Sequence, residues 1–210
     1  MEKNIKIITL GETGVGKTSI INRICYDCYN EDEKSTFTCE THYLTEYYSA
    51  KQITIQLNFI DTFGQEKFLS YLPKQYIRDS HIVLLVFSNK LNLETLKDRW
   101  YKFYKENSNI EKAKFLVIGN KSDIFGANKK EIKSLGKRFA EEINSFFMTC
   151  SAKSEDNIDN IVNHILTEAK RLIDEEEQTI QNTSINRKKS FQIKIEKEEK
   201  KKKKTNKFCC

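Results

Sequence analysis

The sequence has little of what marks a secreted or membrane-spanning protein. No apolar run approaches the 18 residues that a membrane-spanning helix needs, and its N-terminus has no secretory signal pattern. We therefore expect the protein in the cytosol or on the membranes that border it. The six cysteines are then expected to be thiols, lipid acceptors or metal ligands, because disulfides are rare in a reducing compartment.

Apolar residues are also scarce. They make up 38% of the 210 residues, whereas charged residues make up 31%, and this apolar share is low for a globular chain. We therefore expect one domain and a polar segment outside its core. The net charge of +6 is concentrated towards the C-terminal end, which predicts a contact with a membrane or a nucleic acid there.

Hydrophobic periodicity predicts strands that alternate with helices. The predicted strands are residues 5–10, 43–50, 52–60, 82–87, 115–118 and 146–149. The predicted helices cover residues 18–26, 93–103, 132–143 and 158–172. The second and third strands alternate apolar and polar residues, which predicts an antiparallel pair with one solvated face. The whole pattern predicts an α/β fold with a mostly parallel, doubly wound, six-stranded sheet and flanking helices.

The periodic pattern ends at about residue 173. The remaining sequence is rich in Glu, Gln and Lys and has few residues suited to a core. We therefore predict a domain at residues 1–173 and a solvated, disordered tail at residues 174–210.

A glycine-rich loop follows the first predicted strand. The sequence GETGVGKTS at residues 11–19 fits the phosphate-loop motif G-x-x-x-x-G-K-[ST]. Its glycines let backbone N–H groups surround a phosphate chain, Lys17 adds a positive charge at the β- and γ-phosphates, and Thr18 offers a hydroxyl to Mg²⁺. The motif predicts a bound nucleotide, whereas the alternative is a turn that only packs.

The third predicted strand ends in a second phosphate-side motif. In the sequence DTFGQE at residues 61–66, Asp61 can hold Mg²⁺ directly or through water, and Gly64 lets its N–H approach a γ-phosphate. Gln65 can orient an attacking water. The alternative is a strand end that is closed by a capping aspartate and a glycine turn.

Two later strand ends carry residues suited to a nucleotide base. In the sequence NKSD at residues 120–123, the carboxylate of Asp123 can accept hydrogen bonds from guanine N1–H and from its exocyclic amine. Adenine presents the opposite pattern and would leave this carboxylate unpaired. The sequence Ser151-Ala152-Lys153 would complete the base pocket through a backbone N–H. Each motif is common alone, but together they occur at successive strand ends.

With these motifs the chain resembles a Ras-like small GTPase and, within that class, the Rab family. The matching pieces are GETGVGKTS (11–19), DTFGQE (61–66), NKSD (120–123) and CSAK (150–153), within about residues 5–173. The stretch YIRDS at residues 76–80 resembles the Golgi-associated Rab subgroup. The resemblance implies a P-loop G domain that binds GTP and GDP with Mg²⁺. Unaided GTP hydrolysis is expected at about 10⁻⁴ to 10⁻³ per second.

The resemblance also assigns roles to single residues. Thr36, which lies 18 residues after Thr18, would join Thr18 and Asp61 as a Mg²⁺ ligand, with Thr38 and Thr41 nearby as other threonines. Gln65 would be the catalytic residue, and loss of the γ-phosphate would release both switch segments. The implied nucleotide-binding residues are Gly14, Val15, Gly16, Lys17, Thr18, Ser19, Thr36, Gly64, Asn120, Lys121, Asp123, Ser151, Ala152 and Lys153.

Several residues depart from the family pattern. Phe63 replaces the usual alanine beside the water-orienting glutamine, Thr38 stands where glycine is normal, and Ile60 stands where a tryptophan is typical. These changes leave nucleotide binding intact but bear on the rate of hydrolysis and on partners. A second hypothesis is therefore a degenerate GTPase that holds nucleotide with little turnover, and a third is a P-loop kinase or ATPase.

Four residues around the first switch suggest a rival use of that segment. Cys25, Cys28, Cys39 and His42 form the spacing C-x₂-C-x₁₀-C-x₂-H, which suits a tetrahedral zinc site. The favoured alternative is that these residues pack on separate elements of the fold, so that no shared site forms.

The C-terminal end combines a basic run with two cysteines. Lys200–Lys204 precedes Cys209 and Cys210, and each lysine near an anionic leaflet contributes about 1 kcal/mol of attraction. The resemblance implies geranylgeranyl groups on both cysteines, by the double-cysteine route because a C-a-a-X box is absent. Residues 174–199 would be a flexible tether. The lysines lack the aromatic or reading motif expected of nucleic-acid binding.

The resemblance finally implies a place in the cell. We expect a regulator of vesicle and membrane traffic on the cytoplasmic face of Golgi or endosomal membranes that cycles with the cytosol. The expected partners are an exchange factor, a GTPase-activating protein, a GDP-dissociation inhibitor or escort protein, and effectors, with no nucleic acid.

Overall fold

The computed structural model describes residues 2–33, 38–62, 74–108 and 113–205, without the side chains of residue 181 and residues 184–205. The chain divides into two compact units, Met1–Ala169 and Lys170–Cys210, which are described separately.

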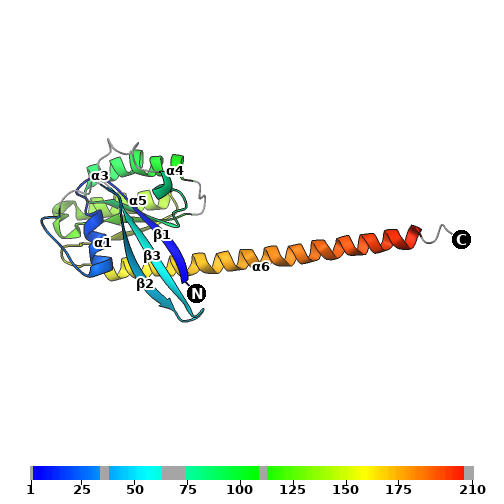
Figure 1. Ribbon diagram of the computed structural model, residues 1–210. Coiled ribbons are helices and arrows are strands. Elements are labelled where there is room, and N and C mark those ends of the chain that lie inside the picture. The colour runs from blue at the N-terminus through cyan, green and yellow to red at the C-terminus, as the bar shows by residue number, and fades with distance from the viewer. Residues whose placement is uncertain (1, 34–37, 63–73, 109–112, 206–210) are drawn as a thin grey trace. The chain divides into compact units, whose positions relative to one another are not determined.

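The first unit is built on a six-stranded sheet with the order β2-β3-β1-β4-β5-β6 (Figure 1). The strands are β1 (Glu2–Leu10), β2 (Glu40–Tyr48), β3 (Ile53–Asp61), β4 (Ile82–Phe87), β5 (Lys114–Gly119) and β6 (Phe146–Thr149). β2 runs antiparallel to β3, and the other neighbouring strands in this sheet are parallel. The predicted doubly wound sheet and its antiparallel pair are confirmed.

Helices and helical turns lie between most of the strands, and one helix follows the last strand. They are α1 (Lys17–Tyr26), α2 (Lys74–Ile77), α3 (Lys90–Thr95), the π-helical turn η2 (Leu96–Tyr101), α4 (Lys102–Asn107), α5 (Lys129–Glu142) and α6 (Ile158–Thr205), with short 3₁₀ turns η3 (Ser122–Ile124) and η4 (Gly126–Asn128). α3, η2 and α4 follow one another without a break. Figure 1 shows α1 and the first turns of α6 on the side of the sheet opposite α3, α4 and α5.

The central strands are buried on both faces. All six residues of β4 are buried, as expected for a strand that helices cover from both sides. Its residues Val83, Leu85 and Phe87 belong to one core cluster. The same cluster includes Trp100 of η2 and Tyr104 of α4. This packing fixes the strand ends, and the loops that follow them carry the predicted site.

The last helix differs from the prediction. The sequence predicted that this helix ends at about residue 172, whereas α6 continues to Thr205. Residues 174–205 contain neither glycine nor proline and are rich in Glu, Gln and Lys, which are good helix formers even without an apolar face. The domain boundary at residue 173 stays a prediction. In the described part of the chain, no helix is long and apolar enough to cross a bilayer.

Candidate nucleotide-binding site

The predicted motifs lie at one edge of the sheet. β1 pairs in parallel with both β3 and β4, and β5 pairs in parallel with β4 and β6. Their carboxyl ends therefore meet, with the phosphate loop after β1 and Asp61 at the end of β3. Asn120 follows β5, and Ser151 follows β6. This edge is where ligands bind in open α/β sheets.

Two glycines of the phosphate loop leave no room for a side chain. A Cβ on Gly11 would lie 2.2 Å from the carbonyl oxygen of Val86. Gly16 has φ of +90° at the N-terminus of α1, and a Cβ there would lie 2.3 Å from Nδ2 of Asn120. A side chain would therefore displace either the loop or its neighbours, so the turn into α1 depends on glycine.

Lys17 lies inside the phosphate loop. Its Nζ donates hydrogen bonds to the carbonyl oxygens of Gly11 at 2.9 Å and Glu12 at 3.0 Å. The residue is only 6% exposed. Burial lowers the pKa of Lys17 to about 8, and the nearby carboxylates of Asp61 and Glu12 oppose this shift. The side chain is thus positioned within the loop that the sequence assigns to the β- and γ-phosphates.

Thr18 and Asp61 form the predicted metal-binding side of the loop. The hydroxyl of Thr18 donates to Oδ2 of Asp61 at 2.6 Å, which joins α1 to the end of β3. A hydroxyl and a carboxylate are hard oxygen donors of the kind that Mg²⁺ prefers, so the pair fits this ion. A bound Mg²⁺ would neutralise charge on the phosphate oxygens. The predicted ligand Thr36 lies outside the described residues, as do Gly64 and Gln65.

Asn120 joins the phosphate loop to the base side of the site. Its Nδ2 donates to the carbonyl oxygen of Val15 at 2.9 Å, and its Oδ1 accepts from the backbone N–H of Ala152 at 3.2 Å. The residue is 1% exposed. One buried amide therefore connects the loops that follow β1, β5 and β6. The sequence assigned Asn120 to nucleotide binding but did not predict this bridging role.

The base-side carboxylate is oriented by a neighbouring loop. The hydroxyl of Ser151 donates to Oδ1 of Asp123 at 2.6 Å, and the N–H of Ser122 donates to the carbonyl oxygen of Cys150 at 2.9 Å. Lys121, which directly precedes Ser122, has φ of +61°. These contacts bring together the two motifs that the sequence assigned to guanine.

The structure adds residues that no motif identified. Nε of Arg23 donates to the carbonyl oxygen of Ala152 at 2.9 Å, and its guanidinium lies 5.9 Å from the ring centroid of Tyr29. Lys153 forms an ion pair with Glu31. The ring of Tyr29 and the carboxylate of Glu31 thus lie near the loops that follow β5 and β6. Residues 27–42 have only a polar, irregular pattern, so these long-range contacts could not be predicted from the sequence.

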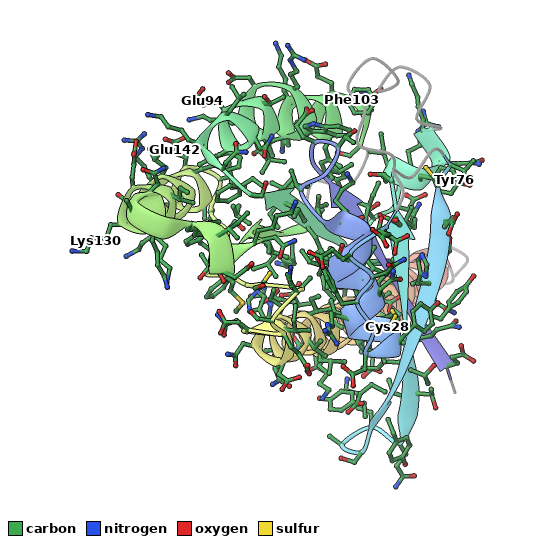
Figure 2. All side chains as sticks on the ribbon, turned by 90° about the vertical axis from the view of Figure 1, so that its left-hand side faces the viewer. Cys28, Tyr76, Glu94, Phe103, Lys130 and Glu142 are labelled. Carbon is green, nitrogen blue, oxygen red and sulfur yellow. The ribbon has the colours of Figure 1, made fainter. Side chains whose placement is uncertain are left out.

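The zinc hypothesis finds no support in the structure. Among the described residues, no group of three or more His, Cys, Asp or Glu side chains could hold a metal ion. Nδ1 of His42 instead pairs with the hydroxyl of Tyr26 at 3.0 Å. Cys25 is half-buried, and burial raises its pKa to about 11. Figure 2 shows Cys28, which is exposed, just past the end of α1. In the structure, His42, Cys25 and Cys28 therefore have separate surroundings and do not converge on a shared site.

A comparison with known families identifies the class of this domain. The sequence model of the Ras family matches residues 6–171. This chain belongs to the Ras family. Its Ras-family domain is therefore a small GTPase switch that binds guanine nucleotides, and GTPases of this family use Mg²⁺. The roles of individual residues in the site remain assignments from the motifs and the geometry.

Proposed function

We propose that this Ras-family GTPase is a Rab-like regulator of vesicle and membrane traffic. The observation that carries the proposal is the C-terminal pairing of Lys200–Lys204 with Cys209 and Cys210, which suits a prenylated membrane anchor. The stretch YIRDS at residues 76–80, which resembles the Golgi-associated Rab subgroup, also supports the proposal. The protein would act on the cytoplasmic face of Golgi or endosomal membranes and cycle with the cytosol.

The proposed anchor combines several contributions to membrane affinity. One lipid chain holds a protein only marginally at a bilayer, whereas two chains or a chain with a basic run give stable binding. Geranylgeranyl groups on both cysteines and the neighbouring lysines supply these signals together. Lipid attachment and release would then require an escort or a GDP-dissociation inhibitor.

Localisation of the tagged full-length protein tests this anchor. The wild type should lie on internal membranes, and the double variant Cys209→Ser with Cys210→Ser should be cytosolic. Cys28→Ser is the matched control, because this exposed thiol lies in the GTPase domain and should not affect membrane binding. Unchanged membrane localisation of the double variant would contradict the proposal.

The proposed cycle assigns each part of the site one task. The phosphate loop holds the β- and γ-phosphates, while Thr18, Thr36 and Asp61 hold Mg²⁺. Gln65 orients the attacking water, and loss of the γ-phosphate releases the switch segments. An exchange factor, a GTPase-activating protein and effectors would act on these two states.

A degenerate GTPase is the second candidate function. Phe63, two positions before Gln65 in sequence, replaces the alanine usual in the family, which favours slow or negligible turnover. Single-turnover hydrolysis with bound GTP separates the two candidates. The switch proposal expects a wild-type rate of about 10⁻⁴ to 10⁻³ per second and a rate at least tenfold lower for Gln65→Leu. A wild-type rate well below this range would instead favour a nucleotide-holding module, and equal rates in the two proteins would contradict the role of Gln65.

A further inference from the structure

The only tryptophan of the chain is bonded to the phosphate loop. Trp100 is fully buried, and its Nε1–H donates to Oε1 of Glu12 at 2.8 Å. A buried indole N–H requires an acceptor, and aromatic residues are usually placed where one is available. Here the acceptor is a carboxylate that lies 88 residues away in sequence and inside the phosphate-loop motif. The contact therefore joins the core to the candidate site.

Glu12 makes one contact through its side chain and another through its backbone. Its carboxylate accepts from Trp100, and its backbone carbonyl oxygen accepts from Nζ of Lys17 at 3.0 Å. The preceding residue, Gly11, has no room for a side chain against the carbonyl of Val86. A displacement of Glu12 would therefore move one of the two carbonyls that hold the Lys17 ammonium.

The other end of the contact is held firmly. Trp100 lies in the π-helical turn η2, between α3 and α4, and it belongs to the core cluster that includes Leu96 and Tyr104. A π turn is rare, and it changes the direction in which the following side chains point. The buried side chains of Leu96 and Trp100 anchor this turn, so the indole N–H is held at a fixed position towards the phosphate loop.

We propose that Glu12 and Trp100 are a positioning pair, whose hydrogen bond holds the phosphate loop in the conformation that directs Lys17 at the nucleotide phosphates. The inference rests on guanine-nucleotide binding by the Ras-family domain and not on the proposed role in traffic. It also makes the emission of Trp100 a direct reporter of the phosphate loop, because no other tryptophan contributes.

The test is the dissociation rate of a fluorescent GDP analogue from the full-length protein with Mg²⁺. Glu12→Ala and Trp100→Phe should each raise this rate about tenfold, because each removes a hydrogen bond that has a charged partner. Glu12→Gln should stay within about twofold of the wild type, since its amide oxygen can accept from the indole. The double variant Glu12→Ala with Trp100→Phe should be no faster than the faster single variant.

Two controls separate positioning from packing. Tyr104→Phe changes another fully buried aromatic residue on the adjoining helix, away from the phosphate loop, and should leave the rate unchanged. The emission of Trp100 should shift when nucleotide is removed from the wild type with EDTA, and Glu12→Ala should abolish most of that shift. Thermal unfolding of every variant shows whether it is folded at the temperature of the measurement.

Three results would overturn the proposal. Variants that melt earlier but release GDP at the wild-type rate would show that the contact only packs. A Glu12→Gln rate equal to that of Glu12→Ala would show that charge, and not the hydrogen bond, is what matters. Rates that multiply in the double variant would show that the two residues act independently. None of these results would bear on membrane localisation.

Discussion

The nucleotide site has two halves that are built in different ways. The phosphate half is the phosphate loop with Asp61, and the base half is formed by the loops that follow β5 and β6. In the phosphate half, Lys17 and Asp61 are almost fully buried, and the lysine is held by backbone carbonyls of its own loop. In the base half, the exposed carboxylate of Asp123 accepts from the buried Ser151 hydroxyl, and the ion pair of Lys153 with Glu31 is exposed. Buried contacts that lose a partner are costly to break, whereas exposed ion pairs contribute at most about 1 kcal/mol.

This contrast matches the tasks of the two halves. Every nucleoside triphosphate has the same phosphate chain, so a fixed, buried framework can bind it. The base must be distinguished from close relatives, which requires oriented side chains such as Asp123 and Ser151. We therefore expect variants in the buried framework to have the largest effects and variants at the exposed rim the smallest.

Asn120→Ala should have the largest effect, because this side chain belongs to both halves. The variant leaves the carbonyl of Val15 and the N–H of Ala152 without their buried partner, so we expect GDP binding to weaken about hundredfold and the protein to melt earlier. Asn128→Ala, which changes an exposed amide, is the control for calorimetric titration with GDP. An effect confined to melting temperature would show that Asn120 is only structural.

Thr18→Val tests the metal side of the phosphate half. Valine keeps the shape of threonine but removes the hydroxyl that donates to Asp61 and is proposed to bind Mg²⁺. For the wild type, chelation of Mg²⁺ with EDTA should accelerate GDP release by at least about tenfold, because Thr18 and Asp61 would hold an ion that neutralises phosphate charge.

Two variants of this threonine make the result interpretable. Thr18→Val should release GDP rapidly in Mg²⁺ and respond little to EDTA, whereas Thr18→Ser retains the hydroxyl and should behave like the wild type. A full EDTA response of Thr18→Val would remove this residue from the set of proposed ligands.

Glu31→Gln should have the smallest effect. It removes the charge that pairs with Lys153 and leaves the phosphate half unchanged. We expect GDP release to rise about two- to threefold at low salt and the difference to fade at high salt. Glu131→Gln is a matched control, since Glu131 forms a comparably exposed ion pair with Lys90 away from the site. Equal changes in both variants would show a general effect of charge.

The fold and the site differ in how far they follow from sequence. Each predicted strand corresponds to an observed one, because buried parallel strands such as Ile82–Phe87 produce continuous apolar runs. The phosphate loop and Asp61 were also predictable, since both lie next to a strand end within a short motif. These features depend on local sequence alone, and the topology of parallel strands brings them together.

The remaining features depend on contacts between distant residues. The bond from Trp100 to Glu12 and the ion pair of Lys153 with Glu31 join residues 88 and 122 positions apart. No local pattern predicts either one. The length of α6 was missed for a different reason. Residues beyond 173 have no apolar period, so only their helix propensity indicates the continuation to Thr205.

Competition between GDP, ADP and XDP for the wild type and for Asp123→Asn tests the central claim most directly. In the wild type, GDP should displace a fluorescent GDP analogue at least about a thousandfold more effectively than ADP, because adenine leaves the oriented carboxylate unpaired. In Asp123→Asn, the preference should move from GDP to XDP, since an amide can pair with the additional carbonyl of xanthine. Equal displacement by GDP and ADP, or a variant that still prefers GDP, would contradict a guanine site formed by Asp123 and Ser151.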